Sequence, residues 1–279
     1  MLGHKLWQHL SARFPDTYTT IRQSRTRYEK CGLFKSDRVI DFVDVTDFQK
    51  LTCVLKRIRP VFILNCIGIT KRRKEADTAI PAIELNALLP HRLVEWGKSN
   101  SAKVINFSTD CVFDGERGNY TEESPTNARD LYGKTKALGE IRGKNALTLR
   151  SSFIGAELQD GTELLEWFLS QTGTVKGFKN AVYSGLTTIE LSRIIEKILV
   201  HYPDATGLYN ISSDPISKFD LLKLIRDKMH IKVNVITDET IRCDRSLDST
   251  KFRNEFHYTP PTWEAMVEEL SRDIKKEGQ

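Results

Sequence analysis

The chain has 279 residues, 39% of them hydrophobic and 28% charged, which suffices for the core of one large domain or two modest ones. Its 42 Lys and Arg face 37 Asp and Glu, a diffuse excess of +5 that favours an anionic ligand but does not predict binding to nucleic acid. The apolar runs are too short to span a bilayer and no signal peptide is visible, while the five cysteines and six histidines lack metal-site spacing, so we expect a soluble, reduced cytoplasmic protein without a metal.

The first half of the chain alternates helices with short apolar strands. A helix is predicted at residues 3–14, followed by strands in "TYTTIR" and "RVIDF". A helix over "TDFQKLTCVLKRI", capped by Thr46, leads into the apolar strand "PVFILNC". "AIELNALLPHRLVEWGKS" is helical despite Pro90, "KVINFS" is a buried strand, "RDLYGKTKALGEIRG" is helical and "ALTLRSS" is a strand. This alternation predicts an α/β fold with a doubly wound parallel sheet, Rossmann-like and NAD(P)-binding, with ligands at the carboxyl ends of the strands.

The pattern loosens after about residue 150. Helices are predicted over "ELLEWFLSQT", "TTIELSRIIEKILVHY", "SKFDLLKLIRDKM" and "PPTWEAMVEELSRDIKK", and strands in "TVKGF" and "GLYNIS". Ser217 precedes Asp220 by three residues, a variant of the capping box, and Pro261 with Thr262 marks a helix start. We expect a dinucleotide-binding domain at 1–155 to which 181–202 returns, and a smaller interleaved α/β substrate lobe from 156–180 and 203–279.

One stretch carries the chemistry. "STDCVFDG" follows the strand "KVINF", and "YGKTK" opens a helix about twenty residues later, placing Tyr132 and Lys136 on one helix face. An ammonium beside a phenol lowers the phenol pKa towards the working range, and Thr109 or Ser108 can bind the same substrate oxygen. This set suits transfer of hydride to a carbonyl, with Tyr132 as proton donor. The alternative is a half-buried core tyrosine beside a solvated lysine.

The densest basic run is "KRRK", Lys71–Lys74, just before a helix. A solvated helix face and a role near ligand phosphates are both open interpretations.

The segment "FSTDCVFDG…TEESPTN…LYGKTKALGE" resembles the extended short-chain dehydrogenase/reductases, and within them the dTDP-4-dehydrorhamnose reductases. The resemblance continues through "LTLRSSFIG", "SGLTTIEL", "GLYNIS" and "SLDSTKF…PTWEAMVEEL", nearly the whole chain. It implies catalytic roles for Thr109, Tyr132 and Lys136. It also implies a set of residues beside the cofactor, namely Leu2, Gly3, Asp44 near the adenine, Asn65, Cys66, Gly68 and Ser108, with Tyr132 and Lys136.

The family's cofactor fingerprint ends in Met-Leu-Gly, which "MLGHKLW" matches. The resemblance therefore implies that Gly3 is the third glycine and that the first strand and first two glycines are absent, so we expect weak cofactor affinity and low stability. The alternative is that Gly3 merely starts a helix.

A second strand ending in an acid would bind the 2′-hydroxyl of NAD. This chain instead has Arg22, Ser24 and Arg25 there, and guanidinium groups suit a 2′-phosphate, so NADP(H) is preferred over NAD(H).

Near the expected sugar, the sequence departs from its relatives. "CIGITKRRKEAD" replaces a segment with a tyrosine and an acid, and Phe153 replaces a tryptophan, so the identity of the sugar is left open. Thr109, Asp110, Val112, Phe153 and Arg245 are the residues expected to contact substrate.

The sequence thus predicts an NADPH-dependent reductase of the 4-keto group of a nucleotide-activated deoxysugar, and the resemblance implies a place in surface polysaccharide or O-antigen precursor synthesis. Asp110 is not followed by Glu, which argues against dehydration. A nucleotide-sugar epimerase of the same superfamily and a non-catalytic NADP-binding regulatory subunit are the alternatives. We expect a nucleotide sugar as partner, with no nucleic acid or membrane. A homodimer is considered, although the sequence does not fix the oligomeric state.

Overall fold

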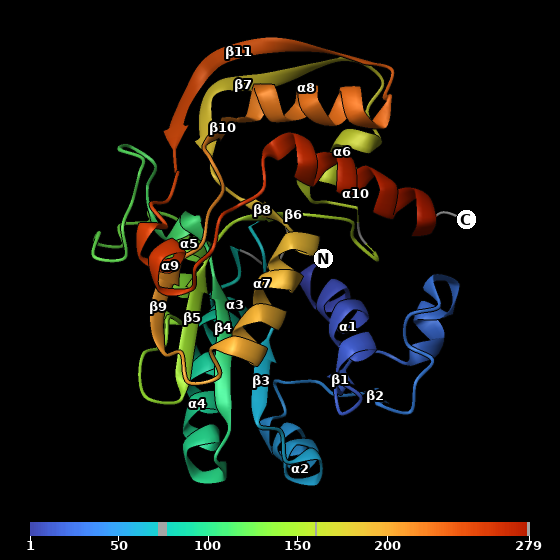
Figure 1. The fold of residues 1–279 in the computed structure, drawn as a ribbon, viewed down its shortest axis with the longest axis vertical. Helices are drawn as coiled ribbons and strands as arrows, with labels where there is room; N and C mark the ends of the chain where they lie inside the picture. The colour runs from blue at the N-terminus through green and yellow to red at the C-terminus, as the bar shows by residue number, and fades with distance from the viewer. Residues whose placement is uncertain (72–76, 160, 278–279) are drawn as a thin grey trace.

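The computed structural model describes residues 1–71, 77–159 and 161–277 (Figure 1). A four-stranded sheet at its centre has the order β3-β4-β5-β9, with all strands parallel. Strands β1 and β2 pair in parallel as a separate sheet, so the parallel strands fall into two sheets rather than one. The α/β fold class is confirmed. The strands are β1 (Thr19–Thr20), β2 (Val39–Ile40), β3 (Phe62–Asn65), β4 (Lys103–Ser108), β5 (Ala146–Arg150) and β9 (Gly207–Asn210).

Helices cover both faces of this sheet because successive side chains of a strand point to opposite sides. Ile105 and Phe107 of β4 face a core that α1 and α7 share, whereas Val104 packs with side chains of α2 and α4 on the other face. The sheet is therefore doubly wound, as predicted. These helices are α1 (Leu2–Arg13), α2 (Phe48–Ile58), α4 (Leu89–Asn100) and α7 (Thr188–His201).

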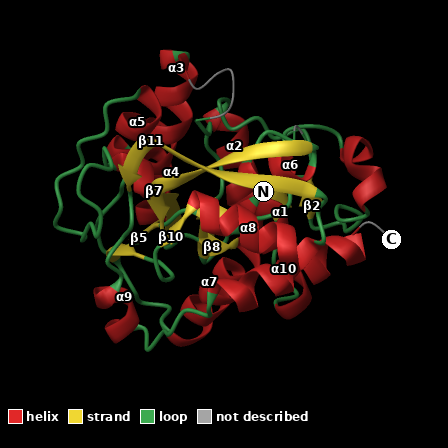
Figure 2. Cartoon of the chain, turned by 90° about the horizontal axis from the view of Figure 1, so that it is seen from above, coloured by secondary structure: helices red, strands yellow, loops and turns green. Residues whose placement is uncertain are grey.

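The second half of the chain builds another layer above the parallel sheet (Figure 1, top; Figure 2). Strand β7 pairs in parallel with β11 and antiparallel with β10, and α8 packs on β7 and β11. Neither β11 nor the short helix α9 was predicted. The elements are β6 (Phe153–Ile154), α6 (Leu164–Leu169), β7 (Gly173–Tyr183), β8 (Leu186–Thr187), β10 (Ile216–Ser217), α8 (Lys218–Met229), β11 (Val233–Asp244), α9 (Thr250–Glu255) and α10 (Trp263–Glu277).

Local chemistry explains where several helices start and stop. Asp47 rather than Thr46 caps α2, because its carboxylate accepts the Lys50 backbone N–H at 3.0 Å. Ser217 caps α8 as predicted. The helix through Pro90 forms in three parts, since proline removes one backbone donor: α3 (Ala79–Ala82), a π-helical turn η3 (Ile83–Leu88) and α4.

One apolar core joins the two layers. Side chains from α1, β4, β5 and α7 share a cluster with those of α8 and α10, including Ile195, Leu222 and Met266. The predicted domain boundaries stay a prediction, but a shared core favours unfolding in one cooperative step.

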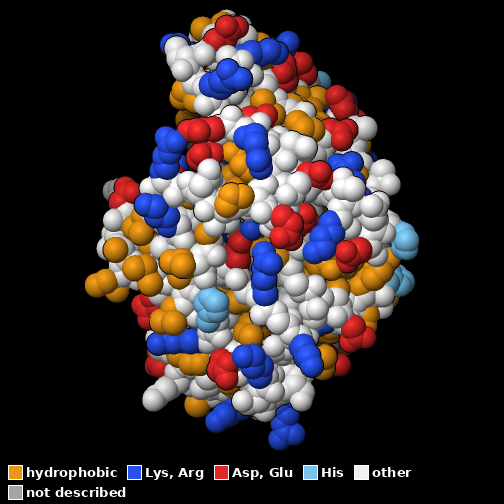
Figure 3. Space-filling view, turned by 90° about the vertical axis from the view of Figure 1, so that its left-hand side faces the viewer, with side chains coloured by type: hydrophobic (Ala, Val, Ile, Leu, Met, Phe, Trp, Pro, Cys, Tyr) orange, Lys and Arg blue, Asp and Glu red, His pale blue; other side chains and the backbone are white. Residues whose placement is uncertain are grey.

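The face in Figure 3 mixes basic and acidic side chains, and hydrophobic side chains gather at its left edge. Among the described residues, no helix combines the length and apolar character needed to cross a membrane.

Replacing Ile195, which is fully buried, tests the shared core. Ile195→Ala should lower the free energy of unfolding by about 2–5 kcal/mol in urea titrations, because it removes packed methyl groups and leaves a cavity. Val61→Ala is the control at a residue that is 68% exposed, and should change stability by less than about 0.5 kcal/mol. Equal effects of the two substitutions would contradict the assignment of this core.

Candidate active site

The site is built around helix α5 (Leu131–Leu138), near the upper end of the parallel sheet (Figure 1). Asp130 caps the helix, accepting the Gly133 backbone N–H at 2.8 Å and a hydrogen bond from the Lys71 ammonium at 2.6 Å. A Cβ on Gly133 would lie 2.2 Å from the Cys111 carbonyl oxygen. Glycine at this position lets the first turn of α5 pack directly on the loop after β4.

This packing brings Thr109, Tyr132 and Lys136 together. The Thr109 side chain lies near the Tyr132 phenol and favours its ionised form, and Lys136, one helical turn further on, donates to the Phe107 carbonyl oxygen at 2.6 Å. Thr109 and Lys136 are buried and Tyr132 is partly buried. The structure therefore unites the three side chains that the sequence singled out.

The electrostatics differ from the expectation that Lys136 lowers the pKa of Tyr132. Burial raises the pKa of the Tyr132 phenol well above its usual value, and the carboxylate of Asp110 acts in the same direction. The Lys136 ammonium is directed at a main-chain carbonyl of β4. Burial lowers the pKa of Lys136 to about 8, and the Glu140 carboxylate opposes this change. The phenol is thus held as a protonated donor.

Behind Lys136 lies a buried ion pair that the sequence analysis missed. The Arg150 guanidinium donates to both oxygens of Glu140, at 2.8 and 2.7 Å, and the two side chains are 1% and 8% exposed. Ser108, predicted beside the cofactor, donates its hydroxyl to Glu140 at 2.6 Å. The sequence did contain a signal for this pair: Glu140 follows Lys136 by four residues, and Arg150 ends the next strand.

The loop after β3 lies between the start of α1 and Lys136. A Cβ on Gly3 would sit 3.3 Å from Cys66 Cβ, and one on Gly68 would sit 4.0 Å from Lys136 Nζ. Asn65 donates to the Asn106 side chain at 2.9 Å, which fixes the end of β3. Leu2 is buried in the core, so its backbone rather than its side chain is available to a ligand.

Asn86, in the π-helical turn, was also missed. Its amide oxygen accepts the Ile69 N–H at 2.9 Å, and its amide nitrogen donates to the Ile69 carbonyl and to the Thr135 hydroxyl. It therefore ties the loop after β3 to α5. A polar residue inside an apolar helical stretch close to a proline was the signal.

The residues after β1 that were predicted to bind the cofactor 2′-phosphate have different surroundings in the structure. The Arg25 guanidinium donates to the Val39 carbonyl at 2.8 Å and lies 3.6 Å from Asp41, so it braces its own loop. The Ser24 hydroxyl caps the following turn, while Arg22 is exposed. Asp44 accepts hydrogen bonds from the backbone and side chain of Thr46, which lower the pKa of its carboxyl.

The predicted substrate residues also differ in their surroundings. Asp110 is buried beside Thr109, and Arg245 donates to the Phe113 carbonyl at 2.8 Å. Phe153 is partly buried against the main core. Val112 is fully buried in a small cluster, because the turn that contains it points its side chain inward, so only its main chain is available to a substrate. Of the basic run, Lys71 meets Asp130, and 72–76 lie outside the described residues.

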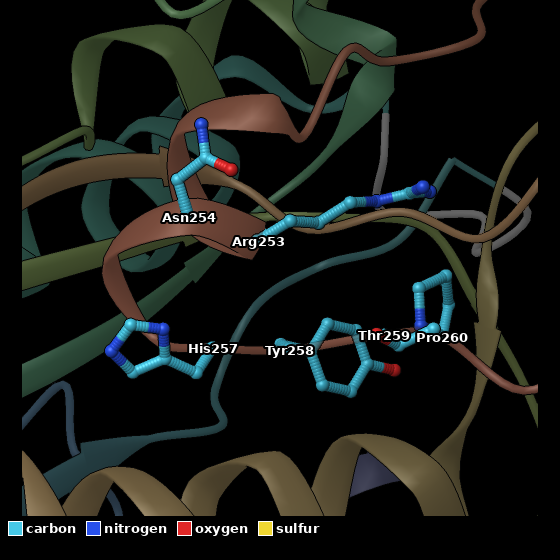
Figure 4. A pocket seen from close by; sticks show the side chains of 6 residues that line it. All are labelled: Arg253, Asn254, His257, Tyr258, Thr259 and Pro260. Carbon is cyan, nitrogen blue, oxygen red and sulfur yellow. The ribbon is translucent and has the colours of Figure 1, made fainter.

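An open hollow of about 420 Å³ lies elsewhere, at α9 and the segment after it (Figure 4). Two of its polar side chains are already engaged: Tyr258 donates to Glu190, and Arg253 donates to the Ser249 hydroxyl and the Ser212 carbonyl. It includes none of the predicted site residues, so we place the candidate site at α5 instead. The hollow is lined by Arg253, Asn254, His257, Tyr258, Thr259 and Pro260.

Comparison with known proteins gives consistent matches. The model of the RmlD substrate binding domain matches residues 1–276. A dTDP-4-dehydrorhamnose reductase of Aggregatibacter actinomycetemcomitans is 24% identical over 269 residues, covering 88% of this chain and 90% of that protein. Three further reductase relatives match over only 33–35% of their own lengths.

Solved structures agree in fold. The crystal structure of a hypothetical dTDP-4-dehydrorhamnose reductase from Sulfolobus tokodaii is 26% identical with a TM-score of 0.74, covering 91% of this chain and 90% of that one. A Bacillus anthracis dTDP-4-dehydrorhamnose reductase in complex with NADP is 21% identical with a TM-score of 0.75, covering 92% and 98%.

The buried ion pair can be tested by removing one partner. Arg150→Met leaves the Glu140 carboxylate buried without its cation and should lower the free energy of unfolding by about 3–5 kcal/mol. Adding Glu140→Gln should recover part of that loss. The control is Lys98→Met, which breaks the exposed pair with Glu95 and should cost about 1 kcal/mol or less. Urea titration measures all three, and similar losses for Arg150→Met and Lys98→Met would refute the buried pair.

Proposed function

The chain belongs to the family of the RmlD substrate binding domain, and from this premise we propose that it catalyses NADPH-dependent reduction of the 4-keto group of a nucleotide-activated deoxysugar. The observation that carries the proposal is the convergence of a protonated Tyr132, the Thr109 hydroxyl and the Lys136 side chain at the end of β4. Relatives named as dTDP-4-dehydrorhamnose reductases support the substrate class.

The residues present fit a dinucleotide. Gly68 keeps the loop after β3 close to Lys136, and Gly3 keeps the start of α1 close to the same loop, so main chain can approach a ligand there. When bound, NADPH supplies the hydride for the substrate carbon. Lys136 would hold the ribose beside the loop from Asn65 to Gly68. Arg22, the exposed guanidinium after β1, is the candidate partner for a 2′-phosphate.

Side chains of this chain then bind and protonate the carbonyl oxygen of the substrate. The Thr109 hydroxyl, which donates to Asp110 in this structure, turns to donate to the keto oxygen, and together with the Tyr132 hydroxyl it orients the keto group. As negative charge develops on the oxygen, Tyr132 transfers its phenolic proton and the product is an alcohol. For the Lys136 ammonium to stabilise the phenolate that Tyr132 becomes, it has to turn from the Phe107 carbonyl towards Tyr132, which lies on the same face of α5.

Two alternatives predict different measurements. An epimerase would return the nicotinamide to its starting redox state, so it would convert sugar nucleotides without net loss of NADPH. A regulatory subunit would bind NADP stoichiometrically without turnover of any keto-sugar.

We also propose a cytoplasmic location and a homodimer. All five cysteines are free thiols, which suits a reducing compartment. Ile80, Ile83 and Leu138 expose large apolar side chains on the neighbouring elements α3, η3 and α5, and a second copy of the chain would cover them. Light scattering would show a dimer as about twice the mass of the 32.0 kDa chain.

Turnover tests the proposal. The chain should oxidise NADPH stoichiometrically with a dTDP-4-keto-6-deoxyhexose, and Tyr132→Phe should lower kcat by about 10²–10⁴-fold because the proton donor is lost. NADPH affinity should be nearly unchanged. Tyr28→Phe, at a tyrosine that packs on Phe34 away from the site, is the control. Full activity of Tyr132→Phe would refute its role, and a wild-type chain that binds NADPH without oxidising it would refute the reductase.

The pH dependence should follow Lys136. Its pKa of about 8 means that the ammonium is lost as pH rises through that value, so kcat/KM for reduction should fall above about pH 8. Glu140→Gln removes the negative charge that favours the ammonium, so the falling limb should move to lower pH. Glu255→Gln, which changes the partner of Tyr209, should leave the limb in place. An unchanged midpoint in Glu140→Gln would contradict this account of the charge on Lys136.

A further inference from the structure

Tyr183 is a buried tyrosine whose hydroxyl is left without a partner. It ends β7, its side chain is 9% exposed, and its ring packs on Trp263 with centroids 5.4 Å apart. Among the described residues, no group hydrogen-bonds to its hydroxyl, although that oxygen is buried. An unsatisfied buried hydroxyl destabilises a folded protein, so its presence calls for an explanation.

The hydroxyls of the other buried tyrosines do have hydrogen-bond acceptors. Tyr120 donates to Asp114 at 2.8 Å, Tyr209 to Glu255 at 2.6 Å and Tyr258 to Glu190 at 3.0 Å. Each of these hydroxyls has a carboxylate of the chain itself as its acceptor. The unpaired hydroxyl of Tyr183 is therefore not how this chain usually buries a tyrosine.

Tyr183 ends β7 close to the loop that carries Asp110. The carbonyl of its neighbour Val182 accepts the Arg245 backbone N–H at 3.1 Å, and the Arg245 guanidinium donates to the Phe113 carbonyl at 2.8 Å, three residues after Asp110.

Burial raises the pKa of the Tyr183 phenol, and the nearby carboxylate of Asp110 acts in the same direction. Asp110 follows Thr109 directly, is 4% exposed and receives the Thr109 hydroxyl at 3.2 Å. The Asp110 carboxylate also acts on the phenol of Tyr132. The Asp110 carboxylate thus borders the place where Thr109 and Tyr132 would hold the keto oxygen, and the phenol of Tyr183 lies within the field of that carboxylate.

We propose that Tyr183 and Asp110 together bind the sugar hydroxyl on the carbon next to the keto carbon, which makes Tyr183 a specificity-determining residue. The inference rests on the proposed function for the position of the sugar. A sugar hydroxyl can donate to the Asp110 carboxylate while it accepts from the Tyr183 phenol, so one group satisfies both side chains. The Asp110 carboxylate lies 3.2 Å from the Thr109 hydroxyl that would hold the keto oxygen on C4, so the sugar hydroxyl within its reach is on a neighbouring carbon. Of the two carbons next to C4, C5 carries the methyl group and the ring oxygen, which leaves the hydroxyl on C3.

Such a pair selects against sugars that lack the hydroxyl. A site built to hydrogen-bond a substrate hydroxyl leaves its own buried polar groups unpaired when the substrate has none. The identity of the sugar was the part of the function that the sequence did not give. In this proposal, the side chains of Tyr183 and Asp110 specify one feature of that sugar, a hydroxyl on the carbon next to the keto carbon.

The test is equilibrium binding by calorimetry of two probes: a dTDP-linked 6-deoxyhexose with a hydroxyl on C3 and its 3-deoxy counterpart. The wild-type chain should bind the hydroxylated probe about tenfold more tightly, the scale of one hydrogen bond. Tyr183→Phe should bind both probes with similar affinity and keep its melting temperature. Tyr209→Phe, at a buried tyrosine with its own acceptor, should keep the preference.

The proposal is overturned if the wild-type chain binds both probes equally or binds neither, or if Tyr183→Phe keeps the full preference. NADPH oxidation by the wild-type chain is measured on the keto-sugar in parallel. A preference that depends on Tyr183 without NADPH oxidation would overturn the reductase and leave this inference standing. NADPH oxidation without a preference for the hydroxylated probe would overturn this inference and leave the reductase proposal standing.

Discussion

The site depends on how closely helix α5 packs against the end of β4. Glycine is required at both ends of the helix: a Cβ on Gly133 would lie 2.2 Å from the Cys111 carbonyl oxygen, and a Cβ on Gly139 would come even closer to that of Asn86. Between these contacts, Lys136 donates to the Phe107 carbonyl. Because these contacts let α5 lie directly against the end of β4, the hydroxyls of Tyr132 and Thr109 come close together where a substrate carbonyl is to be held.

The same contact explains the charges of the site. Tight packing excludes water, which disfavours ionisation of both the phenol and the ammonium. The Glu140–Arg150 pair supplies a fixed carboxylate one turn beyond Lys136, within a network that includes Ser108 and Asn210. Burial of this pair is expensive unless every hydrogen bond is made. Here the pair acts on the protonation of Lys136, which gives the buried charge a role in the proposed reaction.

The sequence predicted those parts of the site that depend on local rules. Tyr132 and Lys136 are four residues apart on one helix, and this spacing alone puts them on one face. Other parts depend on contacts between distant segments: Arg25 is held by the Val39 carbonyl, and Val112 is turned inward by a short 3-10 helix. The roles of Asn86 and Tyr183 depend on contacts with residues far away in the chain, which no local sequence pattern indicates. The alternation of strands and helices gave the fold, whereas the edge strand β11, mostly polar and exposed, carries no apolar periodicity.

The most direct test of the central claim follows the fate of isotope in the product. The chain is incubated with NADPH deuterated at the transferable C4 position and a dTDP-4-keto-6-deoxyhexose, and the sugar is examined by NMR. A reductase that uses Tyr132 as its proton donor predicts one deuterium on C4 of the sugar for each NADPH oxidised. An epimerised or unchanged sugar without deuterium, beside unoxidised NADPH, would contradict the account.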